Sequence, residues 1–365
     1  MATSAALDGR LAELLLVFST PRLAGEELLA GVADLARGAS VVGCSAAADI
    51  GPDGVGEDGV LVLALGGAGF RARTAAAPSH NGPRSAGRVV AERLGPCRSR
   101  GDEFVLMLSA AHAGDQNEVV RGVYGVLGGA VPLVGGTTGN LRTGEPSLQF
   151  HGARVTLDGV VGAAVTSDGP FSIAVEHGLR RIGEPMVVSR SRHGRILELD
   201  GEPALDHYLG SLGAPAEAWS DAGAFEAFAA AHPLGLSLRG GSVQARSVAA
   251  AGFVERTLEC VADVPQGGLV WAATTDRAAA LAATERACEQ ALAGLEDRPP
   301  QTLLVFDCLG RRRLLGPDGS RAELSLITGA AAGAAVAGVY THGEIARTRG
   351  LNAFHNETIV VLALA

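Results

Sequence analysis

The chain has 365 residues, 47% of them hydrophobic and 19% charged, so it can form two packed domains and is too apolar for a disordered protein. Its net charge of −9 gives no electrostatic footprint for nucleic acid. All 30 basic side chains are arginine, which excludes a Schiff-base lysine and a Walker-type phosphate loop.

The cysteines and the N-terminus indicate a reduced, cytoplasmic protein. Five cysteines are present without a C-x-x-C pair, so neither a disulfide framework nor a thiolate zinc site is predicted. The first 18 residues carry acidic side chains ahead of a short apolar run, which is the wrong order for a signal peptide. The uncharged stretch between Glu323 and His342 is rich in Ala, Gly, Ser and Thr, so we expect no membrane segment.

Two β-α-β units are predicted in the first half of the chain. Residues 13–21 and 39–50 have the length of buried strands and flank an amphipathic helix over residues 25–38. Residues 104–112 and 130–140 repeat the pattern around a helix over residues 115–129, which Asp115 and Glu118 open as a capping box.

The pattern returns in the second half. Residues 267–295 predict a strand and a helix with Asp276 as its N-cap, leading into a strand at residues 302–308. An arginine-rich turn, a helix from about Gly319 to Ala334 and a strand at residues 335–345 complete the last unit.

The residues between these units alternate in hydrophobicity. They predict antiparallel hairpins with Asp-Gly, Gly-Gly and His-Gly turns. A helical passage over residues 203–232 is expected to bridge the two halves. The predicted fold is α/β, with two mixed-sheet domains over residues 1–200 and 201–365.

The segment "GVGEDG" at residues 54–59 matches a dinucleotide-binding pattern by its letters only. It follows a Pro-Asp-Gly turn, carries Glu57 and Asp58 where a pyrophosphate needs positive potential, and leads into a strand. The nine histidines are scattered. The sequence therefore predicts no cofactor and no metal site.

Three of the predicted strands end in similar short segments that combine glycine with hydroxyl side chains, at residues 43–46, 135–138 and 338–341. We call these segments the strand exits. Ligands of α/β proteins gather at the carboxyl ends of strands, so these exits are expected to face a common space. Glycine would let the backbone turn or let a ligand approach, and the hydroxyl groups would bind a small polar molecule. Alternatively, the same residues only cap helices and turns.

Two features beside the last exits leave alternatives open. Cys44 and Cys308 follow apolar strands, where a nucleophile could stand, although no local histidine spacing supplies a base. Asp307 and Arg311 flank Cys308 and either clamp an amino or carboxylate group of a ligand or form an internal ion pair.

Several segments resemble the FIST family of sensory domains. They are "VVGCSAAADI", "LVGGTTGN" and "RILELDGEPALDHYLGSLG" in the first half, and "LLVFDCLGRRRLLG", "GVYTHGEIA" and "FHNETIVVLAL" in the second. After Cys44 and Ser45 this chain has Ala46 to Asp49, where family members commonly have Thr-Ala-Gly-Glu.

The resemblance implies a FIST N-terminal-like and a FIST C-terminal-like domain and a sensor of small ligands. Together with the strand exits, it gives a ligand-binding set of Cys44, Ser45, Gly136, Thr137, Asp307, Cys308, Arg311, Tyr340, Thr341, Glu344, His355 and Asn356. His355 and Asn356 are expected to support the site through hydrogen bonds, not to act as a catalytic pair.

The sequence thus favours a cytoplasmic signal-transduction protein that binds a small polar metabolite such as an amino acid. Because no output domain follows residue 365, we expect the signal to pass to a separate protein or through a homo-oligomer, with neither nucleic acid nor membrane as a partner. A thiol-dependent enzyme using Cys44 or Cys308, and a scaffold without a ligand, are the alternatives.

Overall fold

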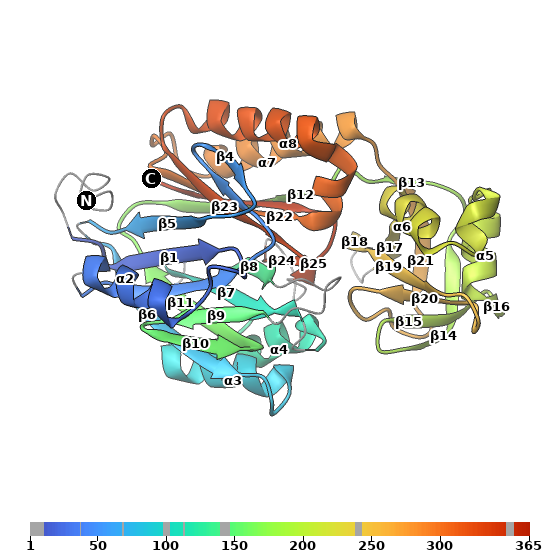
Figure 1. Ribbon diagram of the computed structural model, residues 1–365, viewed down its shortest axis with the longest axis horizontal. Coiled ribbons are helices and arrows are strands. Elements are labelled where there is room, and N and C mark those ends of the chain that lie inside the picture. Colours follow the sequence, from blue (N-terminus) through green and yellow to red (C-terminus); the bar gives the residue numbers. More distant parts are fainter. Residues whose placement is uncertain are drawn as a thin grey trace.

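The structure is a computed structural model that describes residues 11–36, 38–67, 69–97, 103–111, 114–138, 147–237, 243–347 and 354–365. It confirms the predicted α/β class. Three sheets, named A, B and C, surround one apolar core, and a smaller domain lies at one end of this body (Figure 1).

Sheet A contains the first predicted β-α-β unit. Its strands, in spatial order, are β10 (Arg154–Leu157), β9 (Leu148–His151), β2 (Ser40–Ser45), β1 (Leu14–Ser19) and β5 (Val60–Leu65). β1 and β2 are parallel, and α2 (Glu26–Ala36) connects them. Leu29 and Val32 of α2 pack on Leu15 and Val17 of β1, so this helix covers the outer face of the sheet.

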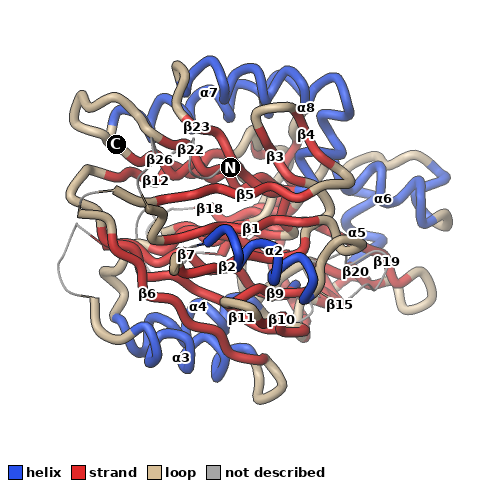
Figure 2. The backbone as a smooth tube through the Cα atoms, turned by 60° about the vertical axis from the view of Figure 1, so that its left-hand side comes forward, coloured by secondary structure: helices blue, strands red, loops and turns tan. Residues whose placement is uncertain are grey.

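Sheet C contains the second unit. Its strands are β25 (Phe354–His355), β24 (Gly343–Ala346), β8 (Leu133–Thr138), β7 (Glu103–Ala110), β11 (Gly159–Thr166) and β6 (Arg71–Pro78). The outer face is covered by α3 (Pro83–Leu94) and α4 (Gln116–Leu127), which lie along the lower side of the molecule in Figure 2. Asp115 caps α4 as predicted, accepting a hydrogen bond from the Asn117 amide.

Sheet B contains the third unit. Its strands are β12 (Phe171–Glu176), β26 (Ile359–Leu364), β22 (Thr302–Cys308), β23 (Ala335–Thr341), β3 (Asp49–Gly51) and β4 (Gly54–Gly56). The outer face packs against α7 (Arg277–Ala293) and α8 (Leu309–Ala331). Asp276 caps α7 as predicted.

Helix α8 begins about ten residues before the predicted start, so the expected arginine-rich turn was wrong. The segment after Cys308 is already helical. A kink at the non-helical Gly316, with φ 64°, separates it from the second part of α8, which starts within about two residues of the predicted Gly319. The reason is Arg311, which points inward and bonds Asp307 one turn earlier. A solvent-exposed arginine cluster would not have fixed this turn.

The smaller domain spans residues 180–274 and has its own core. Its strands are β13 (Arg180–Arg181), β14 (Met186–Arg192), β15 (Arg195–Leu199), β16 (Glu202–Pro203), β17 (Leu234–Ser237), β18 (Val243–Arg246), β19 (Val248–Gly252), β20 (Thr257–Cys260) and β21 (Leu269–Thr274). Its helices are α5 (Ala204–Ser211), the 3-10 helix η2 (Ala216–Trp219) and α6 (Ala222–Ala231). These helices were expected to bridge the halves, but Tyr208 and Phe225 bury them against this domain's own sheet.

The predicted turns of this domain can be followed in the backbone. His193-Gly194 and Asp200-Gly201 have positive φ at both positions, as a two-residue hairpin turn requires. The Gly-Gly turn at residues 240–241 lies outside the described residues.

The two halves of the sequence are interleaved in space. β12 pairs with β26, β8 with β24, and β3 with β23, so each of these ladders joins the first half of the chain to the second. Residue 201, the expected domain boundary, lies in the β15–β16 turn inside the smaller domain. The division at that residue stays a prediction.

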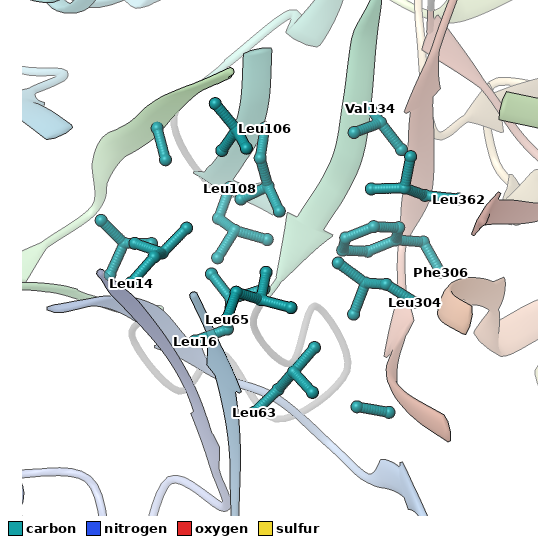
Figure 3. Packing of buried hydrophobic residues seen from close by; sticks show 14 of the residues in the cluster. Leu14, Leu16, Leu63, Leu65, Leu106, Leu108, Val134, Leu304, Phe306 and Leu362 are labelled. Atoms are coloured by element: carbon teal, nitrogen blue, oxygen red, sulfur yellow. The ribbon is translucent and has the colours of Figure 1, made fainter. Parts of the chain in front are cut away.

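The central core receives one face of each of the three sheets. Figure 3 shows side chains from all three sheets meeting there: Leu14 and Leu16 from sheet A, Leu106 and Val134 from sheet C, and Phe306 and Leu362 from sheet B. Each fully buried leucine or phenylalanine of this kind stabilises the fold by about 1.5–3 kcal/mol. This packing holds the ends of the strands in fixed positions relative to one another.

A substitution at Gly43 tests how closely β1 and β2 approach each other. A Cβ atom at Gly43 would lie 1.9 Å from the Val17 carbonyl oxygen of the neighbouring strand, so we expect Gly43→Ala to lower the free energy of unfolding by about 2–4 kcal/mol. Gly31→Ala, on the exposed side of α2 with open space around it, should be neutral or stabilising by up to about 1 kcal/mol. Urea denaturation measures both, and equal stabilities for the two variants would contradict the close approach.

Candidate functional site

The exits of β2, β8 and β23 converge, as the sequence predicted. The Tyr340 amide donates to the Ala48 carbonyl at 3.1 Å, which joins the β23 exit to the β2 exit. The His342 amide donates to the Thr137 carbonyl at 2.9 Å, which joins it to the β8 exit. The three strand exits therefore meet at one place between the sheets.

The β2 and β8 exits also contact each other directly. Cys44 and Thr138 are hydrogen-bonded through their side chains, and the Ser45 hydroxyl accepts a hydrogen bond from the Leu148 amide at 3.0 Å. These four residues are buried or nearly so. Their polar groups form hydrogen bonds within the protein at this junction.

The glycines of the exits also serve packing between strands. A Cβ atom at Gly136 would lie 2.5 Å from the Thr341 side chain, and one at Gly338 would lie 2.4 Å from the Val305 carbonyl oxygen. The absence of a Cβ atom at these glycines therefore allows neighbouring strands to pack closely.

Glu344 ties sheet C to sheet B at the centre of the junction. Its two carboxyl oxygens accept hydrogen bonds from the hydroxyl groups of Thr341 and Thr358, both at 2.7 Å. Burial raises the pKa of Glu344 from 4.5 to about 8, and the two threonine hydroxyls lower it by a smaller amount. Thr358, which directly precedes β26, is thus part of this network.

Asp307, Arg311 and Glu323 form a second buried network, between β22, α7 and α8. The Arg311 guanidinium donates to Asp307 Oδ1 at 2.8 Å and to Glu323 Oε1 at 2.6 Å, and it also donates to the Thr284 hydroxyl at 2.8 Å. Of the two alternatives for Asp307 and Arg311, the structure shows the internal ion pair.

Two carboxyl oxygens of this network lie outside its ordinary hydrogen bonds. Asp307 Oδ2 and Glu323 Oε2 are buried and have no ordinary hydrogen-bond partner among the described residues, while the two side chains themselves interact. Burial and the neighbouring Glu323 raise the pKa of Asp307 well above its usual range, and Arg311 opposes this effect.

The two cysteines at the strand ends are poor nucleophiles in this environment. Burial raises the pKa of the Cys44 thiol to about 12. Burial, with the carboxyl groups of Glu344 and Glu357, raises the pKa of Cys308 well above its usual range. The Cys308 sulfur accepts a hydrogen bond from the Glu357 amide at 3.4 Å.

His355 and Asn356 hold the backbone near the β23 exit. A ring nitrogen of His355, Nε2, lies 2.9 Å from the Ala346 carbonyl, and burial lowers the pKa of this imidazole to about 4. The Asn356 side-chain amide donates to the His342 carbonyl at 3.2 Å. Both side chains thus contact backbone carbonyl groups, and their predicted support of a ligand site stays a prediction.

An open pocket of about 730 Å³ lies beside these networks, at the carboxyl ends of β22 and β23. We call it the arginine pocket. Its lining comes from the loop after β2, the β4 region, the first half of α8 and the β23 exit: Ala47, Gly54, Val55, Glu57, Leu309, Arg312, Arg313, Gly316, Pro317, Ser320, Arg321 and His342. The kink of α8 at Gly316 forms part of the wall.

Positive charge dominates the arginine pocket. Arg312 forms an ion pair with Glu57 and stacks over the Tyr340 ring, with 5.0 Å between the guanidinium carbon and the ring centroid. Arg313 has no ion-pair partner within the part of the chain that the structure describes. The Arg313 side chain is exposed, and its charge lowers the pKa of the nearby Glu357 carboxyl.

None of the twelve predicted ligand-binding residues lines the arginine pocket. Ala47 and His342, which directly follow two of the strand exits, line it instead. Arg312 and Arg313 were missed because three consecutive arginines suggest a solvated surface. Helical periodicity could have separated an inward Arg311 from its two neighbours. Whether any of the twelve contacts a ligand stays a prediction.

Two family models match the chain. The FIST N domain matches residues 13–202 and the FIST C domain matches residues 204–347, so the chain belongs to the FIST family. FIST domains are associated with sensing and signal transduction. The fold and the strand-end pocket thus belong to a protein of a sensory family.

Two relatives are uncharacterized proteins of Mycobacterium tuberculosis, from strains CDC 1551 / Oshkosh and H37Rv. Each is 29% identical to this chain over 259 residues, which is 69% of the chain. The chain spans 66% of the length of each relative.

Two further features concern the described residues as a whole. None of their helices combines the length and the apolar character needed to cross a bilayer. Their His, Cys, Asp and Glu side chains form no group of three that could hold a metal ion.

Glu344 should make folding weaken as the pH rises through neutrality. Its carboxyl group ionises near pH 4.5 in the unfolded chain but only near pH 8 in the folded protein, so its contribution to stability is full below about pH 4.5 and is lost up to about pH 8. Between about pH 5 and pH 8, the wild type should lose about 3 kcal/mol relative to Glu344→Gln, which cannot ionise. A difference between the two proteins that does not change with pH would contradict a protonated, buried Glu344.

The buried cysteines should resist alkylation. Iodoacetamide at about pH 7.5 should label Cys44 and Cys308 far more slowly in the folded protein than in urea, because both thiols are inaccessible and protonated. Mass spectrometry of the peptides gives both rates. Fast labelling of either residue in the folded state would restore the thiol-enzyme alternative.

Proposed function

We propose that this protein is a cytoplasmic sensor that binds a small carboxylate metabolite, an amino acid or a similar compound, in the arginine pocket. The observation that carries the proposal is the exposed Arg313 guanidinium in a pocket at the carboxyl ends of parallel strands. Such strand ends are the usual ligand sites of α/β folds. A guanidinium fork matches a carboxylate with two parallel hydrogen bonds.

The pocket offers complementary groups for the rest of an amino acid. Glu57 lies in its lining and is largely exposed, so it can exchange part of its ion pair with Arg312 for a ligand ammonium group. Leu309, Val55 and Ala47 supply apolar surface for a side chain. This combination favours a zwitterion over a simple anion.

The buried Asp307–Arg311–Glu323 network supports this pocket from below. It fixes the first turn of α8, and Arg312 and Arg313 belong to that turn. Preorganised side chains lower the entropy cost of binding a small ligand. The bound state would then be passed on to a separate signalling protein, or through a homo-oligomer.

Arg313→Ala tests the pocket. In thermal-shift and calorimetric titrations against the twenty amino acids and small carboxylates, at least one compound should stabilise the wild type, because binding to the folded state raises apparent stability. Arg313→Ala should weaken its affinity about tenfold to a hundredfold through loss of a charge-assisted contact.

Arg84→Ala is the matched control. Arg84 is also exposed and lies on α3, on the opposite side of the molecule from α8 (Figure 1), so its loss should leave the affinity unchanged. Equal weakening by both variants would show a nonspecific charge effect. No stabilisation by any compound at about 1 mM would remove the proposed function.

A further inference from the structure

A cavity of about 1010 Å³ lies at the end of the sheets opposite to the arginine pocket. It runs between β5 of sheet A and the first half of β23 of sheet B, and we call it the edge cleft. Consecutive residues of both strands line it, Leu61 to Leu65 on one side and Ala335 to Ala337 on the other.

Consecutive residues line a cavity only along a strand edge, because successive side chains point to opposite faces. Leu61, Leu63 and Leu65 belong to the central core, whereas Val62 and Ala64 pack on the α2 side. In β23, Ala337 faces the central core and Val336 faces α7 and α8. The edge cleft therefore passes between the two strand edges and does not lie on a sheet face.

Within the part of the chain that the structure describes, no strand pairs with the outer edge of β5, since β5 ends the strand order of sheet A. The β1–β5 ladder pairs Ser19 with Val60, so Thr20 and Gly59 are the next opposed residues. The Thr20 amide donates a hydrogen bond to the Gly59 carbonyl, which makes them a hydrogen-bonded pair. Hydrogen-bonded and non-hydrogen-bonded pairs alternate along an antiparallel ladder, so the backbone groups of Leu61, Leu63 and Leu65 bond to β1. The backbone N–H and C=O groups of Val62 and Ala64 consequently point into the edge cleft.

The facing edge of β23 is also open. The ladder between β23 and β3 covers only Gly338 and Val339, and by the same alternation Val336 is the next residue whose backbone groups face away from β22. Its partner in that register would be Pro52, which lines the cleft and has no N–H to donate. Pro52 thus ends the ladder and leaves Val336 open.

We propose that the edge cleft binds an extended peptide, which pairs with β5 and with β23 and joins sheets A and B. Strand addition gives such a ligand backbone hydrogen bonds on both sides. Its inward side chains, at every second position, would meet Leu63, Leu65 and Phe70 and must be apolar. Five residues of β5 set the length of the paired segment at about 17 Å. This site is separate from the arginine pocket and does not depend on its ligand.

A labelled peptide of sequence Gly-Val-Thr-Val-Thr-Val-Gly tests the edge cleft in fluorescence anisotropy with the full wild-type chain. We expect saturable binding in the micromolar range. The same peptide with N-methyl groups on alternate residues keeps its side chains but cannot pair along one edge, so its affinity should fall about tenfold or more.

Two protein variants probe the same edge. Ala64→Pro removes an N–H that faces the cleft and leaves the β1 ladder intact, so it should weaken binding of the unmodified peptide about tenfold, whereas Ala64→Val, which keeps that N–H, should not. Equal affinity for the methylated peptide would overturn strand pairing in favour of a simple apolar cavity. Absence of binding would overturn the proposal, and a dimeric protein that binds no peptide would assign the cleft to a second copy.

Discussion

The buried guanidinium of Arg311 is the interaction on which the candidate site depends. It joins the end of β22, through Asp307, to α8 through Glu323 and to α7 through Thr284. Removing one partner from such a buried pair typically costs about 3–5 kcal/mol, because the other charge is left without compensation. Since successive helical residues are about 100° apart, an inward Arg311 turns Arg312 and Arg313 toward the pocket.

The second constraint is the junction of the three strand exits. Glu344 accepts hydrogen bonds from Thr341 and Thr358, and the exit glycines let neighbouring strands approach without a Cβ atom between them. A buried polar network that is satisfied in this way fixes one arrangement of the sheets. The arginine pocket lies beside the junction, and Ala47 and His342, which directly follow two of the exits, are part of its lining.

Much of this fold could be predicted because its signals are local. Apolar runs, the caps at Asp115 and Asp276 and the turn glycines placed the β-α-β units and predicted that their exits meet. The pairing of β24 with β8 and of β3 with β23 joins residues far apart in the sequence, and no local pattern encodes such partners. Glu323 and Thr284 were missed for the same reason, since helical spacing alone does not show which distant ion they face.

A crystal structure with a bound amino acid tests the central claim most directly. The account predicts a carboxylate held by Arg313 in the arginine pocket, with Arg311 still paired to Asp307 and Glu323. Density for the compound at any other place, with the arginine pocket empty, would contradict it.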